Sequence, residues 1–173
     1  MTYFSYLHII TIYLITDMSN VTTYNQIINR FQQWANVHDQ IEHFSYGLID
    51  VMDLEKFPRY PFMHVMINKV DYMDGMKTVD INVIFCDCPR NNKDKTEYQA
   101  EVLNDLQLVA EDLIASVTFS QANFFGDLVT VQGVSAEPFV EQYENTLTGW
   151  NINFALLVPF NPDSCIIPSS IPV

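Results

Sequence analysis

The sequence predicts an α+β domain in which two helices cover one face of a twisted, mostly antiparallel sheet, in the order α-β-β-β-α-β-β-β. Two segments repeat their apolar residues at helical spacing, and shorter runs with strand-like alternation follow each of them. An Asp-Gly pair between two of these runs is typical of a tight antiparallel hairpin. Because 173 residues with 49% hydrophobic side chains can enclose one sizeable core, we expect residues 18–173 to form a single domain and residues 1–17 to be an apolar extension.

The first predicted helix covers residues 23–38. Thr23 and Gln26 have the spacing of a capping box, and apolar residues follow at intervals of three and four. Residues 41–53 alternate too quickly for a helix, so we expect a strand there, bulged at Gly47.

Residues 62–70 and 76–86 are the next two predicted strands. The segment between them ends in Asp74-Gly75, which supplies the positive φ angles that a tight turn requires. We therefore expect these strands to pair antiparallel, and we expect a polar loop at residues 89–94.

Residues 97–117 carry the strongest helical periodicity in the chain, so a second helix is expected there. Three further strands are expected after it, at residues 128–131, 136–142 and 147–159. Gly133 is expected to bend the chain between the first two of them.

The N-terminal extension is nearly all apolar over residues 3–16, apart from His8. At about 14 residues it is shorter than the roughly 20 that span a bilayer, and its flanks lack the marks of a secretory signal. Three interpretations stay open: an upstream extension with translation starting at Met18, an extra strand or partner-binding arm, and a membrane-associating segment.

The charge balance is strongly acidic, with 8 Lys and Arg against 21 Asp and Glu and a net charge of −13. A groove that grips nucleic acid is not expected, because neutralising phosphates needs clustered cations. An acidic surface would instead let DNA pass without binding. The 3 cysteines are an odd number in a chain that can fold without cross-links, so reduced thiols are expected rather than a disulfide framework.

Residue types used in catalysis are present, but without a recognisable pattern. A zinc site could draw on Cys86, Cys88 and Cys165 with one histidine, but Cys-x-Cys lacks the usual two-residue spacer. Aspartates near strand ends could suggest a metal-dependent hydrolase, but turn chemistry explains those of the hairpin. We therefore expect no catalytic residue, no metal and no cofactor. The candidate histidines are His38, His43 and His64, and the candidate acids are Asp50, Asp53, Asp71, Asp74, Asp80 and Asp87.

Five short segments within residues 18–168 carry a resemblance to a known family. They are His38-Asp39-Gln40-Ile41-Glu42-His43-Phe44-Ser45-Tyr46-Gly47, Tyr60-Pro61-Phe62-Met63-His64-Val65, Glu137-Pro138-Phe139, Thr148-Gly149-Trp150 and Asn161-Pro162-Asp163-Ser164-Cys165. Together with the order of the elements, they resemble small virion proteins of tailed bacteriophages, of the tail-terminator or tail-completion group of the neck region. The resemblance implies a structural protein that forms a ring, usually of six copies, at the head-proximal end of the tail.

The same resemblance implies partners and a location. The partners would be further copies of the chain, the tail tube protein and the head-tail connector proteins. DNA would pass through the lumen without specific binding, and no membrane would be involved. The protein would be made in the host bacterial cytoplasm and end in the tail or neck of the virion. A non-viral α+β protein-binding module is the alternative, and a metal-dependent hydrolase is a further one.

Three groups of residues are predicted to form the subunit interface: the hairpin tip, a basic loop and an aromatic pair. Exposed loops and sheet edges suit contacts between copies that close into a ring. Trp150 is interpreted differently, as an anchor that holds the closing strand against the second helix, with Gly149 also supporting the fold. The predicted interface residues are Tyr72, Met73, Asp74, Gly75, Arg90, Lys93, Lys95, Phe124 and Phe125.

Overall fold

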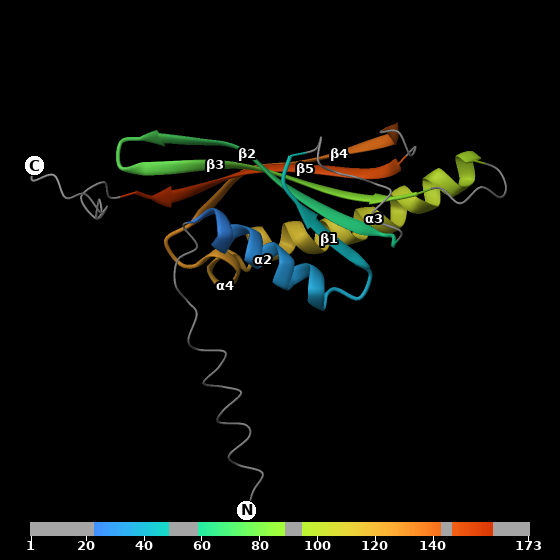
Figure 1. The fold of residues 1–173 in the computed structure, drawn as a ribbon, viewed down its shortest axis with the longest axis horizontal. Coiled ribbons are helices and arrows are strands. Elements are labelled where there is room, and N and C mark those ends of the chain that lie inside the picture. Colours follow the sequence, from blue (N-terminus) through green and yellow to red (C-terminus); the bar gives the residue numbers. More distant parts are fainter. Residues whose placement is uncertain (1–22, 49–58, 89–94, 143–146, 161–173) are drawn as a thin grey trace, which may run out of the picture.

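One five-stranded sheet carries helices on a single face (Figure 1). The computed structural model describes residues 23–48, 59–88, 95–142 and 147–160. The strands lie in the order β1-β2-β3-β5-β4, and the predicted α+β class is confirmed. The elements are α2 (Tyr24–Val37), β1 (His43–Tyr46), β2 (Phe62–Met73), β3 (Met76–Asp87), α3 (Lys95–Thr118), α4 (Gln121–Phe125), β4 (Thr130–Gln142) and β5 (Leu147–Pro159).

Helix α2 begins as the sequence predicts. Thr23 is its N-cap, and the Gln26 N–H donates to the Thr23 hydroxyl at 3.4 Å while the Thr23 N–H donates to Gln26 Oε1 at 3.0 Å. This capping box supplies partners for backbone groups that the first helical turn leaves unpaired. The face of α2 that meets the sheet is apolar and buries Ile27, Ile28, Phe31 and Ala35.

The hairpin of β2 and β3 is also confirmed, and both strands are longer than expected. Asp74 and Gly75 have φ angles of 50° and 73°, which fit the two-residue turn that matches the twist of the flanking strands. The register runs from Met73 opposite Met76 to Phe62 opposite Cys86. The chain therefore builds a long antiparallel pair around one tight turn.

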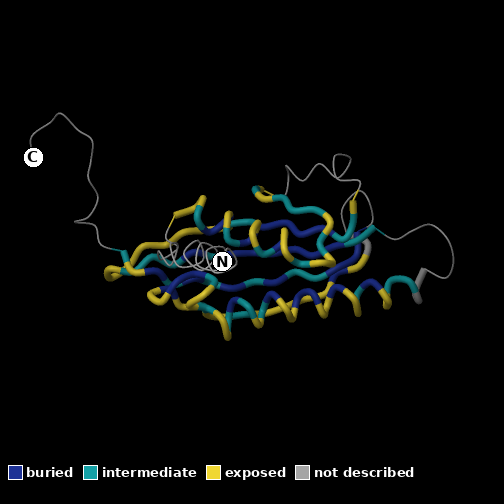
Figure 2. Tube along the Cα trace, turned by 90° about the horizontal axis from the view of Figure 1, so that it is seen from below, coloured by how far each residue is buried: buried dark blue, intermediate teal, exposed yellow. Residues whose placement is uncertain are grey.

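The core lies between the sheet and the long helix α3, where Figure 2 shows the buried positions gathered. Leu106, Val109, Leu113 and Val117 of α3 are all 1% exposed or less. Trp150 of β5 donates its indole N–H to the carbonyl of Leu103 at 2.8 Å. The predicted role of Trp150 as an anchor between the closing strand and the second helix is thus confirmed.

Replacing Trp150 by phenylalanine is expected to lower the free energy of unfolding by about 1–2 kcal/mol, because the Leu103 carbonyl loses its indole donor. Denaturant titration would measure the change. Trp34→Phe is the matched control: it removes an indole bond to the hydroxyl of Ser116, which keeps a second hydrogen bond to the Asp112 carbonyl. A loss for Trp150→Phe no larger than that for Trp34→Phe would contradict the anchoring role.

The predicted six strands are wrong in number, because residues 128–131 and 136–142 do not form two strands. β4 is continuous from Thr130 to Gln142, and its register to β5 shifts between Gln132 and Ser135. Gly133, with a φ of 64°, is accommodated as an irregularity within the strand instead of ending it. Within the described residues the element order is therefore α-β-β-β-α-α-β-β.

Two further differences concern β1 and α4. The predicted strand 41–53 is reduced to the 4 residues of β1, which pair with β2 in parallel; residues 49–53 lie outside the described part of the chain. A parallel neighbour is possible because more than a dozen residues separate the two strands. The 5-residue helix α4 has no counterpart in the prediction, since one turn and a half is too short to show a period.

Candidate interaction site

The most exposed apolar side chains of the sheet lie on an arm formed by the distal ends of β2 and β3. Figure 1 shows this turn and the end of β5 projecting past the helices. Val70, Tyr72 and Met73 are 39%, 60% and 74% exposed. By strand alternation, Val70 and Tyr72 lie on one side of the arm and Met73 on the other, so both sides carry exposed apolar surface.

Contacts with the end of β5 hold the arm in place. The Phe160 N–H donates to the Gly75 carbonyl at 2.8 Å, and the rings of Tyr72 and Phe160 meet edge-to-face with centroids 4.9 Å apart. On the arm, Lys69 Nζ lies 2.7 Å from an Asp71 carboxylate oxygen, and this hydrogen bond raises the pKa of Lys69. The tip is thus already ordered before it meets another molecule, which lowers the entropic cost of binding.

The structure brings together one of the three predicted interface groups. Tyr72, Met73, Asp74 and Gly75 are neighbours at the exposed tip. Lys95 begins α3, whose first turns lie at the end of the sheet opposite to the tip (Figure 1). Arg90 and Lys93 lie outside the described residues.

Burial argues against Phe125 as an interface residue, whereas Phe124 is only partly buried. Phe125 is 0% exposed, and its ring packs against that of Phe31 with centroids 5.8 Å apart. The ring of Phe124 also packs against Phe31, with ring centroids 5.5 Å apart. Both rings face the core because they belong to helix α4. The side chain of Gln121 connects this helix to β4, since its Oε1 accepts the Val131 N–H at 3.1 Å.

Within the described residues, no further strand covers the outer side of β4 or the distal half of β2, although the Gln121 side chain bonds the backbone at the start of β4. β1 covers β2 only as far as Val65, whose carbonyl accepts the Gly47 N–H at 3.0 Å. Residues 66–73 of β2 therefore have no strand on their outer side within the described chain, and neither has β4 on the opposite side of the sheet. The sequence could not reveal these edges, because they depend on the order of the strands and not on their composition.

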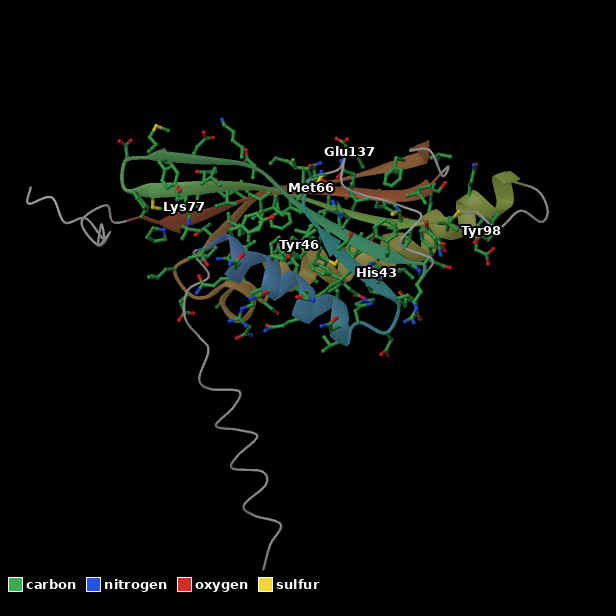
Figure 3. All side chains as sticks on the ribbon, viewed as in Figure 1. His43, Tyr46, Met66, Lys77, Tyr98 and Glu137 are labelled. Carbon is green, nitrogen blue, oxygen red and sulfur yellow. The ribbon has the colours of Figure 1, made fainter. Side chains whose placement is uncertain are left out.

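The face of the sheet opposite to the helices has a polar part and an apolar part, the latter a buried cluster that includes Phe62, Ile84 and Cys86. In its centre, Asn82 Nδ2 donates to Asn153 Oδ1 at 2.6 Å and also to Asn151 Oδ1. Figure 3 shows Glu137 on this side of the sheet. By strand alternation, the charged side chains described here are Asp71, Asp80 and Glu137 with the single cation Lys69.

A serine and a histidine join β1 to β2 on this face. Ser45 Oγ lies 2.7 Å from His64 Nδ1, and His64 Nε2 lies 3.2 Å from the Gly47 carbonyl. Burial lowers the pKa of His64, although the contact with Gly47 acts in the opposite direction. A neutral ring donates from Nε2 to the carbonyl, so its Nδ1 accepts the Ser45 hydroxyl proton.

Serine and histidine in contact are also the first two members of many nucleophilic sites. Here His64 is only 2% exposed. Its second ring nitrogen is hydrogen-bonded to a backbone carbonyl, whereas such sites use a carboxylate at that place. The arrangement fits a clamp between two strands better than a substrate-binding centre.

Acidification below pH 6.5 is expected to weaken the fold through His64. Because its folded-state pKa is lowered from 6.5, the unfolded chain takes up the proton first as the pH falls. The contribution of His64 is therefore complete above pH 6.5 and declines below it. In urea titrations, the stability difference between the wild-type chain and His64→Gln should shrink from about pH 7.5 to about pH 5.5. A difference that stays constant would contradict a neutral, buried His64.

The residues considered for zinc do not assemble into a site. Burial raises the pKa of the Cys86 thiol well above its usual value and also raises that of Cys88, which disfavours the thiolate form that binds metal. Cys86 packs instead in a small apolar cluster with Phe62 and Phe139. His38 lies 3.4 Å from Asp112, and Cys165 lies outside the described residues.

The carboxylates considered for hydrolysis are also dispersed. Asp71 and Asp74 belong to the arm, Asp80 lies on the helix-free face, and Asp87 accepts the Cys88 N–H at 2.6 Å. Asp50 and Asp53 lie outside the described residues. In the described part of the chain, no group of 3 or more His, Cys, Asp or Glu residues could hold a metal ion.

Comparisons with known proteins do not place the chain in a family. No protein-family model matches it, and no curated protein is significantly similar to it. None of the described helices is long and apolar enough to cross a membrane.

Proposed function

We propose that the chain is a structural subunit that assembles with copies of itself into a ring. Following the resemblance in its sequence, we propose that this ring terminates the tail tube of a phage at the head-proximal end and joins it to the connector. The observation that carries the proposal is the ordered arm with exposed Tyr72 and Met73 at one side of the sheet, where the described residues place no strand beside residues 66–73 of β2. Different surfaces on the two sides of a subunit are what a closed ring requires.

The helix-free face supports a role around DNA. Its described charges are three carboxylates and one lysine, which is paired with Asp71, and they lie among neutral amides beside the apolar cluster of this face. Such a face repels phosphates over roughly 8–10 Å at physiological salt. A ring that turned this face inward would let DNA pass without holding it, while the helices would form the outer wall.

The mass of the assembled protein tests the proposal. Native mass spectrometry of the full chain, alone and with purified tail tubes, should show a discrete ring, of six copies if the resemblance holds. A chain that stays monomeric and does not associate with tail tubes would contradict the proposal. A stable complex with one unrelated protein, without self-assembly, would favour the binding-module alternative.

A further inference from the structure

We propose that the apolar segment of residues 3–16 of each copy in the ring packs against the helix side of the arm of the next copy. This contact rests on the proposed function, because it requires that copies of the chain assemble. Its occupant is a named part of a second copy, and residues 3–16 are thereby assigned the partner-binding role among the interpretations that their sequence leaves open. Residues 1–22 lie outside the described part of the chain.

The helix side of the arm carries an apolar surface that adjoins the core. Val70 lies opposite Val79, which is buried in the core beneath the helices. Strand alternation puts Tyr72 on the same side as Val70, and the ring of Phe160 packs against Tyr72 with centroids 4.9 Å apart. Lys77, opposite Tyr72, is half-buried, which suits a side chain whose apolar stem lies along this surface. The core thus continues onto the arm, where Val70 and Tyr72 are 39% and 60% exposed.

Residues 3–16 offer a surface of the same kind. Their sequence contains no Asp, Glu, Lys or Arg, and apart from His8 and a few hydroxyl side chains it is aliphatic and aromatic. Covering such a segment with another apolar surface is favourable, because it removes apolar area from water. Copies with a net charge of −13 also repel one another. An uncharged segment is therefore the part of the chain that can approach a neighbour at the lowest electrostatic cost.

The segment is attached on the side of the sheet where this surface lies. The described chain begins at Thr23, the N-cap of α2, and α2 packs against β1 and β2 on the helix side. Figure 1 shows the first turn of α2 toward the end of the molecule from which the arm projects. The connecting residues 17–22 can reach up to about 20 Å when extended, which is about the width of a sheet of five strands. The segment can therefore reach the arm of a copy beside its own.

The length of the segment favours a contact between copies over one within a copy. The β-branched residues at positions 9–12 favour an extended conformation, in which residues 3–16 span about 46 Å. The exposed part of β2 in the arm, residues 70–73, spans only about 13 Å. One arm is too short to cover the segment, whereas a junction between two copies offers surfaces of both.

The contact has the symmetry of a ring. Each copy gives its segment to one neighbour and receives a segment from the other, so the two contacting surfaces of a copy differ. A contact of this heterologous kind closes when the rotation between copies completes a circle. In the closed ring every arm and every segment is covered, whereas an open chain would leave one of each exposed.

Charges placed in the segment test its role in assembly. The full chain with Ile10→Glu and Ile12→Glu should keep the circular dichroism spectrum of the wild-type chain. It should need at least about tenfold higher concentrations to form the ring in native mass spectrometry. Asn20→Glu with Thr22→Glu is the matched control, because it adds the same charge at the same spacing in the connecting residues, and its ring should persist. A ring equally stable in both variants would overturn the contact.

A mixture of two defective chains tests whether the contact joins different copies. Val70→Glu with Tyr72→Glu impairs the arm and keeps the segment, and Ile10→Glu with Ile12→Glu does the reverse. Each variant alone should stay monomeric. Their mixture, chemically cross-linked before mass measurement, should contain a heterodimer and no larger assembly, because one intact junction remains. A segment that packs on the arm of its own copy, or that binds a membrane, would give no heterodimer.

The outcomes separate this contact from the proposed function. If the wild-type chain forms a ring but the mixture gives no heterodimer, the copies meet through another surface and the ring itself still stands. If the wild-type chain assembles neither alone nor on tail tubes, both the proposed function and the contact are wrong. Should Val70→Glu with Tyr72→Glu fail to fold, the comparison of the two segment variants decides alone.

Discussion

Replacing Gly149 by alanine is expected to cost more than about 4 kcal/mol, a large part of the roughly 5–15 kcal/mol that stabilises a typical domain. A Cβ atom at this position would lie 1.9 Å from the Phe85 carbonyl oxygen and 2.8 Å from the Cys86 Cα. Both are main-chain atoms of the paired strand β3, so neither can rotate away. The two central strands would have to separate where they are fully buried.

Soluble yield and denaturant titration would measure this effect. Gly133→Ala is the matched control, because a Cβ there has no atom within 4 Å and meets only the strain of a φ of 64°, which costs about 1–2 kcal/mol. If Gly149→Ala lost no more stability than Gly133→Ala, the close approach of β3 and β5 at this point would be wrong.

The double substitution Tyr72→Glu, Met73→Glu is expected to abolish assembly while leaving the monomer folded. Both side chains are more than half exposed, at 60% and 74%, so few contacts of the core are lost. Placing two charges in an interface built around exposed apolar residues would cost at least about 2 kcal/mol for each contact. Because every junction of a ring carries the change, the ring should disappear at concentrations where the wild-type chain assembles.

Light scattering after size-exclusion chromatography would measure assembly, and circular dichroism would verify the fold. Phe119→Glu is the matched control, because Phe119 is 91% exposed and follows the end of α3, outside the arm. A double variant that assembles as well as Phe119→Glu would show that the tip takes no part in the interface.

Local patterns were enough to predict helices α2 and α3 and the hairpin. The capping box at Thr23, the periodicity of α3 and the turn at Asp74-Gly75 each depend on residues close together in the sequence. The prediction was wrong where contacts between residues distant in the sequence determine the secondary structure. Gly133 reads as a break, but pairing with β5 carries β4 past it.

The candidate site divides in the same way. The tip was predictable, because a turn between two long strands places its residues in solvent. Phe125 was wrongly predicted to be exposed at the interface. Nothing in the sequence indicates the short helix α4, which directs its side chain into the core. The contact of Ser45 with His64 joins residues 19 apart in the sequence and depends on the parallel register of β1 and β2. The uncovered outer side of β2 depends on the order of the strands in the sheet.

Gly149 has a consequence for folding accuracy as well as for stability. β3 and β5 are paired over their whole lengths, and a slip by two residues would keep apolar side chains on the proper face. Such a slip would bring Leu147 or Asn151 to the place beside Cys86, and each carries the Cβ for which there is no room. Only the native alignment puts the glycine of β5 there, so a ladder shifted by two residues is disfavoured by the same steric clash.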